Sequence, residues 1–352
     1  MNIISLFSGC GGLDLGFRQA GFNVTFANEY DASIWETYEL NSSETKLEKR
    51  DIRNLKSNDI PSCIGIIGGP PCQSWSEAGA RRGINDTRGQ LFYEYIRLVQ
   101  DKQPLFFLAE NVRGILASRH IKAFTNILNH FRAIGYNVSY KLLNANDFSV
   151  PQDRQRVIIV GYHEKLRLHF QFPQPISKKL TLKDAIYDLR FIEPKKIKGK
   201  LEIHHQQIQN HEYLDTGYSS IYMSRNRVRS WEEPSFTIQA GGRHAPIHPQ
   251  ANKMIFVEKD KRIFDPNSPK PYRRLSVREC ARIQTFPDDF IFKYDHINHG
   301  YKMVGNAVPI NLAKILAQKI YLDLHKYLDL EGDNKTFDNL HLPKQLTLIY
   351  PS

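Results

Sequence analysis

The sequence predicts an α/β protein in which a doubly wound, mostly parallel sheet is joined to a smaller, irregular domain. In the first 165 residues, short β-branched or aromatic runs alternate with amphipathic segments of helix length. From about Phe172 this alternation gives way to proline breaks, lysine clusters and polar stretches. Alternating strands and helices indicate a parallel sheet with helices on both faces.

Each predicted element follows from its local pattern. Apolar runs predict strands at residues 2–7, 23–28, 64–68, 105–110, 137–144 and 156–162, and amphipathic segments predict intervening helices that include 33–40, 91–100 and 120–135. Later in the chain we expect weak strands at 235–240 and 253–259 and helices at 276–286 and 309–328. We therefore predict a cofactor-binding and catalytic domain at 1–170, a second domain at 171–290, a C-terminal helix returning to the first domain at 291–330, and a tail at 331–352.

The charge of the chain predicts a polyanionic partner. The formal net charge is +11, and residues 171–290 hold 21 Lys+Arg against 14 Asp+Glu. A solvated basic surface without such a partner is the alternative. No apolar run reaches transmembrane length, and the N-terminus lacks a signal-peptide pattern, so we expect a cytoplasmic protein without membrane contact. The four cysteines lack Cys-x-x-Cys spacing, so we expect free thiols and no metal site.

A glycine-rich turn follows the first predicted strand, in "SLFSGCGGLDLGF". Gly9, Gly11 and Gly12 would let the backbone approach a ligand at a helix N-terminus. Glu29 ends the second strand, where a carboxylate is suited to ribose hydroxyls. Asp51 would close the same pocket, or be a plain surface carboxylate. The pattern predicts an adenosine-containing cofactor, and its departure from G-x-G-x-x-G favours S-adenosylmethionine over a nicotinamide cofactor.

Two reactive side chains follow neighbouring strands. Cys72, in "GGPPCQSWS", comes where the chain turns out of the sheet, and Arg81 and Arg82 lie nearby in sequence. A thiol placed there would act as a nucleophile, the alternative being an inert loop cysteine. Glu110 ends the next strand and would serve as an acid or hydrogen-bond donor, or as a helix cap. Its proximity to Cys72 favours the catalytic interpretation.

Arginines recur at two places in the chain. Arg154 and Arg156 stand just before a strand, where they would pair with carboxylates such as Glu110 or bind a phosphate. Further on, three arginines at every second position and one in "AGGRH" form a set suited to guanine edges and phosphates: Arg225, Arg227, Arg229 and Arg243. A solvated charge run is the alternative for this set.

Taken together, these motifs resemble those of the DNA cytosine-5 methyltransferases. The resemblance covers nearly the whole chain, and six motifs stand in the order usual for the bacterial family: "FSGCGGLDLGF", "GGPPCQSWS", "ENV", "QDRQRV", "RRLSVRECARIQTFPDDF" and "GYKMVGNAVPINLA". It implies a Rossmann-like methyltransferase fold and a target-recognition domain at 171–290. Within that domain, "MSRNRVRSWEEPSFTIQAGGRHAPIHPQ" resembles the recognition segment of GGCC-specific modification methylases.

The resemblance also implies roles for individual residues. Cys72 would add to carbon 6 of a flipped-out cytosine in double-stranded DNA, Glu110 would hold ring nitrogen 3, and Arg156, with Arg154 beside it, would hold Glu110 and the base. The implied contacts to S-adenosylmethionine are Phe7, Gly9, Gly11, Leu13, Glu29, Asp51, Pro70, Leu91 and Asn306. The implied biological role is protection of DNA in a restriction-modification system, by a monomer.

Three other functions fit part of the pattern. An RNA cytosine methyltransferase would share the scaffold, although the long arginine-bearing domain and "PPCQSWS" favour DNA. A non-catalytic DNA-binding module would not need Cys72, Glu110 and Arg156 together. A nicotinamide oxidoreductase fits the cofactor turn and the thiol loop poorly.

Overall fold

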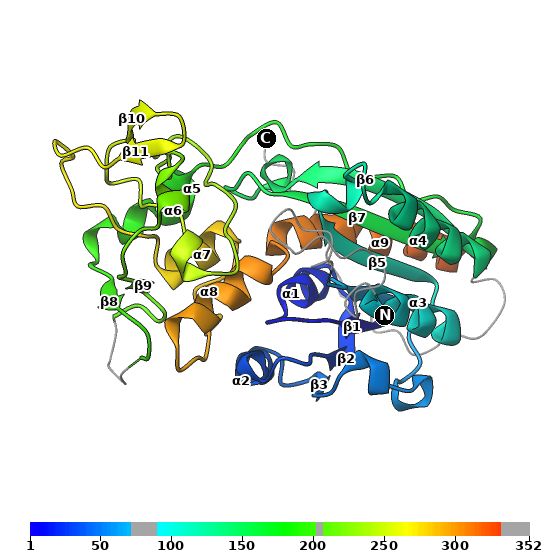
Figure 1. The fold of residues 1–352 in the computed structure, drawn as a ribbon. Helices are drawn as coiled ribbons and strands as arrows, with labels where there is room; N and C mark the ends of the chain where they lie inside the picture. The colour runs from blue at the N-terminus through cyan, green and yellow to red at the C-terminus, as the bar shows by residue number, and fades with distance from the viewer. Residues whose placement is uncertain (72–89, 202–206, 332–352) are drawn as a thin grey trace.

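The computed structural model describes residues 1–71, 90–201 and 207–331, and these form two lobes (Figure 1). The larger lobe holds a seven-stranded sheet, and the smaller lobe holds two two-stranded sheets among short helices. Four of the six strand pairings in the large sheet are parallel, which confirms the predicted fold class. The smaller lobe is irregular, as the proline-rich and lysine-rich sequence predicts.

The strand order of the large sheet is β3-β2-β1-β4-β5-β7-β6. The strands are β1 Asn2–Leu6, β2 Asn23–Asn28, β3 Lys46–Glu48, β4 Gly65–Gly68, β5 Phe106–Val112, β6 Tyr136–Asn144 and β7 Gln155–His163. The order reverses direction at β1, where β2 and β4 lie on either side. In open α/β sheets, ligands bind at the carboxyl ends of the strands beside such a switch point.

The β5, β6 and β7 edge departs from the parallel arrangement. β7 lies between β5 and β6 and is antiparallel to both. Only residues 145–154 connect β6 to β7, which is too short for the crossover that a parallel pair requires. The antiparallel pairing brings the start of β7 beside the end of β5, so that Arg156 lies opposite Val112.

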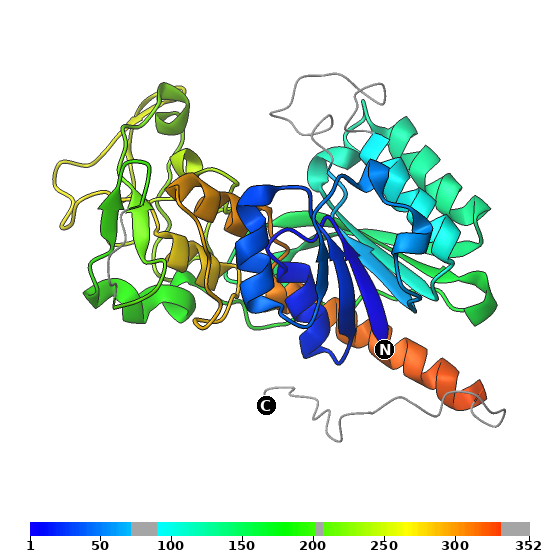
Figure 2. The same ribbon diagram turned by 90° about the horizontal axis from the view of Figure 1, so that it is seen from below.

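Helices cover both faces of the sheet (Figure 2). On one face, α1 Gly12–Gln19 and α9 Ile310–Glu331 pack over a core that includes Phe17, Phe106 and Leu312. On the other face, α3 Gln90–Lys102 and α4 Ile121–Ala133 cover a second core. The sheet is therefore buried on both faces. Because both faces are buried, the sequences of its strands are nearly continuous apolar runs.

The smaller lobe is built from short elements. Its strands are β8 Lys195–Ile197, β9 Glu212–Leu214, β10 Ile255–Glu258 and β11 Lys261–Ile263, and its helices are α5 Leu182–Ile186, α6 Ser220–Met223, α7 Val277–Ile283 and α8 Ile297–Asn306. The prediction of a strand at 235–240 was wrong, because this segment makes a single bridge, from Ser235 to Gln152. Further hydrogen bonds join this segment to Gln152, Asp153 and Arg154 of the large lobe.

A shared hydrophobic cluster joins the two lobes. It combines Cys10 and Ile34 of the large lobe with residues of α7 and α8 in the small lobe. α2 Ala32–Asn41 also contacts α8 across this boundary. The cluster continues through Phe286, Phe290 and Phe292, on both sides of the predicted boundary at 290. Across the described stretches of the chain, no helix is long and apolar enough to cross a membrane.

Candidate active site and nucleic-acid interface

A cleft of about 550 Å³ opens at the carboxyl ends of β1, β2, β4 and β5. Eight of the nine predicted cofactor residues line it: Phe7, Gly9, Leu13, Glu29, Asp51, Pro70, Leu91 and Asn306. The ninth, Gly11, lies behind the wall, where an added Cβ would be 3.2 Å from the Tyr38 ring. The predicted catalytic residues Glu110, Arg154 and Arg156 line the same cleft.

The turn after β1 is held in an unusual backbone conformation. Phe7, Gly9 and Gly11 have φ angles of 55°, 56° and 89°. A Cβ at Gly9 would meet no atom within 4 Å, so the backbone angle and the open space for a ligand explain this glycine. Left-handed geometry is unfavourable at Phe7, and such strain occurs at ligand sites when the surrounding structure enforces it.

Two carboxylates face the cofactor end of the cleft. Glu29 accepts hydrogen bonds from the backbone N–H of Gly9 at 2.9 Å and of Asp31 at 2.7 Å, which ties the ends of β1 and β2 together. Burial raises the pKa of Glu29. Asp51 instead pairs with Arg53 at 2.6 Å, and this hydrogen bond lowers the pKa of Asp51.

Glu110 and Arg156 form an ion pair in the same cleft. Glu110 lies opposite Ile158 in the ladder, so Arg156 is its diagonal neighbour on the same face. Arg156 Nε is 2.8 Å from Glu110 Oε1, and the two side chains are 12% and 11% exposed. Burial lowers the pKa of Arg156, and the neighbouring carboxylate opposes this shift. The carboxylate and the guanidinium predicted to act together are therefore in contact.

Arg154 has a different environment from the one we predicted. Its guanidinium is buried and donates to the carbonyl groups of Ile238, Gly305 and Ala307, at 2.9, 2.8 and 3.0 Å. These acceptors lie in the segment 235–240, in α8 and in the turn after α8. Burial lowers the pKa of Arg154 well below its ordinary value, and the like charge of Arg156 adds to this effect. The side chain holds three segments together at the rim of the cleft.

Cys72 lies outside the described residues. The chain reaches it through Pro70 and Pro71, which both line the cleft. The Asn111 side chain donates to the carbonyl oxygen of Pro70 at 3.1 Å and fixes this approach beside Glu110. The segment that leads to Cys72 and the Glu110–Arg156 pair therefore share one wall.

The family profile described as C-5 cytosine-specific DNA methylase matches residues 1–322. The chain belongs to this family. It is 60% identical to the type II methyltransferase M.MthTI of Methanothermobacter thermautotrophicus over 94% of this chain and 99% of that protein. It is 56% identical to the type II methyltransferase M.FnuDI of Fusobacterium nucleatum, over 91% and 94% of the two chains.

A solved structure supports the fold assignment. A prophage-encoded protein from E. coli, described as a DNA modification methyltransferase, superimposes with a TM-score of 0.68 at 26% identity, over 92% of this chain and 99% of that one. The protein is thus a DNA cytosine-5 methyltransferase of the type II, restriction-modification kind, and its methyl donor is S-adenosylmethionine.

The cleft of the methyltransferase fits this donor. Phe7, Leu13, Pro70 and Leu91 supply apolar walls, while the carboxylate of Glu29 stands at the end of β2. The left-handed turn at Gly9 removes side-chain bulk where the donor would approach the backbone. Sequence reasoning did not identify Tyr30, which also lines the cleft and is 71% exposed. Its position directly after Glu29 at the strand end was the available signal.

The four predicted DNA-binding arginines of the methyltransferase differ in environment. Arg225 and Arg243 are exposed. Arg227 is half-buried, with its guanidinium 4.7 Å from the Tyr222 ring centroid and its Nε donating to the Tyr222 carbonyl at 2.9 Å. Arg229 is ion-paired within the protein. The four side chains are therefore not presented alike on one side of an extended chain.

Proposed function

We propose that this methyltransferase transfers a methyl group to carbon 5 of a flipped-out cytosine in double-stranded DNA, within the sequence GGCC. The observation that carries the chemistry is the Glu110–Arg156 pair, 2.8 Å apart, on the cleft wall that leads to Cys72. The residues suited to S-adenosylmethionine line the same cleft. A cytosine between them must have left the base stack, because a stacked base cannot enter such a cleft.

The residues of the chain would activate the cytosine for methyl transfer. The Cys72 thiolate forms a bond to carbon 6, and the electron pair of the 5,6 double bond moves to carbon 5 while Glu110 donates a proton or hydrogen bond to nitrogen 3. Arg156 orients the Glu110 carboxyl group. When bound, S-adenosylmethionine would supply an electrophilic sulfonium methyl group to carbon 5, and the sulfur–methyl bond would break to leave S-adenosylhomocysteine. A base then removes the proton from carbon 5, the double bond re-forms, and the Cys72 thiolate leaves.

GGCC is supported by the recognition-segment resemblance and by the chemistry of arginine. The site has two guanines on each strand, and the planar guanidinium matches the O6 and N7 acceptors of guanine in the major groove. Exposed Arg225 and Arg243 and half-buried Arg227 are the proposed readers. A monomer suffices, because an asymmetric subunit reads a palindrome in either orientation. We place the enzyme in the cytoplasm, with its DNA substrate.

Mapping the methylated bases tests this proposal. Plasmid DNA, duplex oligonucleotides and tRNA would be incubated with the enzyme and labelled S-adenosylmethionine, and the modified cytosines would be located by sequencing. We expect 5-methylcytosine in duplex DNA at one position of GGCC. Modification at other duplex sites would contradict the specificity, and preferential labelling of tRNA would support the RNA methyltransferase alternative.

A further inference from the structure

A short segment before β7 is hydrogen-bonded along its length to the small lobe. Pro151, Gln152, Asp153 and Arg154 lie beside residues 235–238, and we call this contact the lobe junction. Ser235 N–H donates to the Pro151 carbonyl at 2.9 Å, and Asp153 N–H donates to the Ser235 carbonyl at 2.9 Å. Ile238 N–H donates to Gln152 Oε1 at 2.8 Å. The junction therefore fixes the start of the strand that carries Arg156.

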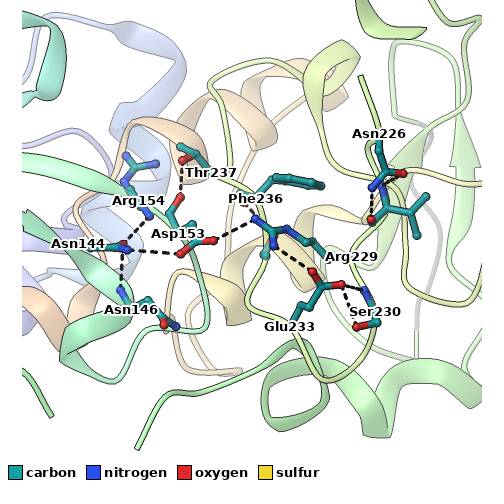
Figure 3. Close-up of polar contacts among 12 residues, drawn as sticks. Asn144, Asn146, Asp153, Arg154, Asn226, Arg229, Ser230, Glu233, Phe236 and Thr237 are labelled. Carbon is teal, nitrogen blue, oxygen red and sulfur yellow. Dashed lines mark hydrogen bonds and ion pairs between the residues drawn. The ribbon is translucent and has the colours of Figure 1, made fainter. Parts of the chain in front are cut away.

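Arg229 adds a charged connection to the lobe junction (Figure 3). One terminal nitrogen of its guanidinium is 3.0 Å from Asp153 Oδ2, and the other is 3.0 Å from Glu233 Oε1. The guanidinium carbon lies 4.3 Å from the centroid of the Phe236 ring. The side chain is 26% exposed, so these contacts are partly shielded from water.

Both carboxylate partners of Arg229 are themselves fixed. The side chain of Glu233 also accepts from Ser230 N–H at 2.9 Å and pairs with Lys253 at 3.1 Å. These contacts lower the pKa of Glu233 to about 2. The backbone carbonyl of Asp153 accepts a hydrogen bond from the Thr237 hydroxyl at 2.5 Å, and the Asp153 side chain accepts one from the Asn144 side chain at 3.3 Å (Figure 3). Arg229 thus connects two carboxylates that are each held by further contacts, Asp153 in the large lobe and Glu233 in the small lobe.

This environment differs from that expected of a DNA-reading arginine. A bidentate contact to guanine or phosphate needs two N–H groups of the guanidinium, at least one of them on a terminal nitrogen. In Arg229 both terminal nitrogens already face carboxylates, whereas Arg225 and Arg243 are exposed. Binding DNA through Arg229 would leave Asp153 and Glu233 as negative charges facing the phosphates. The contacts of Arg229 favour a role inside the protein.

We propose that Arg229 is a positioning residue that, through Asp153, holds the DNA-reading segment in a fixed position relative to the Glu110–Arg156 pair. The inference rests on the proposed function, because it takes Arg225 and Arg227 to contact the target. Arg229 is two residues from Arg227, and Asp153 is three residues from Arg156. The Arg229–Asp153 ion pair therefore couples recognition of the target sequence by Arg225 and Arg227 to placement of the cytosine beside Glu110.

The test is a double-mutant cycle on Arg229→Gln and Asp153→Asn. The methylated site is first mapped with the wild type, and kcat and KM are then measured on that duplex and on one with a single base pair changed. We expect each variant to lower the kcat/KM ratio between the two duplexes about tenfold, with the double variant no worse than either single one. The loss should fall mainly on kcat for the correct duplex, and the salt dependence of DNA binding should be unchanged.

A matched control removes an ion pair that does not reach the lobe junction. Lys183→Gln breaks the contact of Lys183 with Glu232, 3.1 Å apart in the same lobe, and should leave the discrimination ratio unchanged. Thermal unfolding of every variant separates loss of positioning from loss of fold, because a merely structural defect would lower Tm without changing discrimination.

Two outcomes would overturn the inference in different ways. If Arg229→Gln weakens binding to all duplexes alike and reduces the salt slope by about one while Asp153→Asn does nothing, Arg229 contacts a phosphate. If the wild type methylates no duplex, the proposed function itself fails, and that result appears before any variant is made.

Discussion

At the scale of single residues, the main feature of the active site is the ion pair between Glu110 and Arg156. The side chains of Arg156 and Glu110 are only 12% and 11% exposed, so removal of either one leaves the other as a largely desolvated charge without its partner. The family resemblance implied this contact, and pairing with carboxylates such as Glu110 was one of two interpretations of the arginines. The antiparallel direction of β7, which brings the start of that strand beside the end of β5, was not predicted. The carbonyl partners of Arg154 could not be predicted, since they lie 84 or more residues away in the chain.

Replacing Glu110 by Gln tests the role of the carboxyl group. The amide keeps the shape of the side chain but cannot transfer a proton, so we expect kcat to fall by about 10²–10⁴. DNA and S-adenosylmethionine binding should change little. Single-turnover methylation and equilibrium binding of the same variant check this, and a variant that retains more than about a tenth of wild-type kcat would contradict the role.

Replacing Arg227 by Ala tests base reading. A bidentate arginine–guanine contact contributes about 1–3 kcal/mol of discrimination, so the preference for the target over a one-base variant should fall about ten- to hundredfold. Arg262→Ala is a matched control, because Arg262 also lies over an aromatic ring of the small lobe, 5.2 Å from the Phe256 centroid. Sequencing of the methylated sites provides the measurement, and an unchanged preference in Arg227→Ala would locate the readout elsewhere in residues 171–290.

At the scale of secondary-structure elements, local sequence patterns predicted the strands and helices of the large lobe but not the elements that depend on contacts between distant residues. The strands and helices of the large lobe were predicted well, because long apolar runs and helical periodicity recur between short turns. The segment 235–240 was predicted wrongly as a strand, because its hydrogen bonds go to Gln152, Asp153 and Arg154 rather than to a neighbouring strand. The Arg229–Asp153 pair spans 76 residues, so no local pattern could indicate it.

The packing of α1 against α9 gives a prediction at this scale. A Cβ on Gly16 would lie 2.4 Å from the Ala313 Cβ and 2.8 Å from the Ile310 carbonyl oxygen. Although alanine favours helix formation, we expect Gly16→Ala to lower the free energy of unfolding by about 2 kcal/mol through overpacking. Urea unfolding measures this change. Adding Ala313→Gly should recover part of the loss, and a Gly16→Ala variant as stable as the wild type would contradict the close packing.

At the scale of the whole molecule, buried polar networks make the stability of the enzyme depend on pH. His248 is fully buried, with Nε2 3.4 Å from Glu279 Oε1, and the network also includes Arg273 and His211. Burial lowers the pKa of His248 from 6.5 to about 4. Below pH 6.5 the unfolded chain binds a proton here that the folded protein does not, so acid favours unfolding. The contribution is complete above pH 6.5 and is lost as the pH falls towards 4.

This linkage predicts a pH-dependent difference between two proteins. His248→Asn keeps an acceptor for the Gln250 N–H but does not titrate in this range. Between pH 6.5 and 4.5 we expect the unfolding free energy of the wild type to fall more steeply than that of the variant, by about 1.4 kcal/mol per pH unit. Glu279 does not produce this difference, because its pKa is lowered and its contribution is lost only below about pH 4.5. Parallel curves of unfolding free energy against pH for the two proteins would contradict the lowered pKa of His248.

Trapping of a covalent adduct tests whether Cys72 attacks carbon 6 of the target cytosine while Glu110 holds the ring. A duplex with 5-fluorocytosine at the mapped position is incubated with the enzyme and S-adenosylmethionine, and the covalent complex is digested and examined by mass spectrometry. Fluorine cannot leave carbon 5 as a proton does, so we expect a stable adduct on Cys72 and none with Cys72→Ser. An adduct on any other residue, or wild-type methylation of ordinary DNA by Cys72→Ser, would contradict the account.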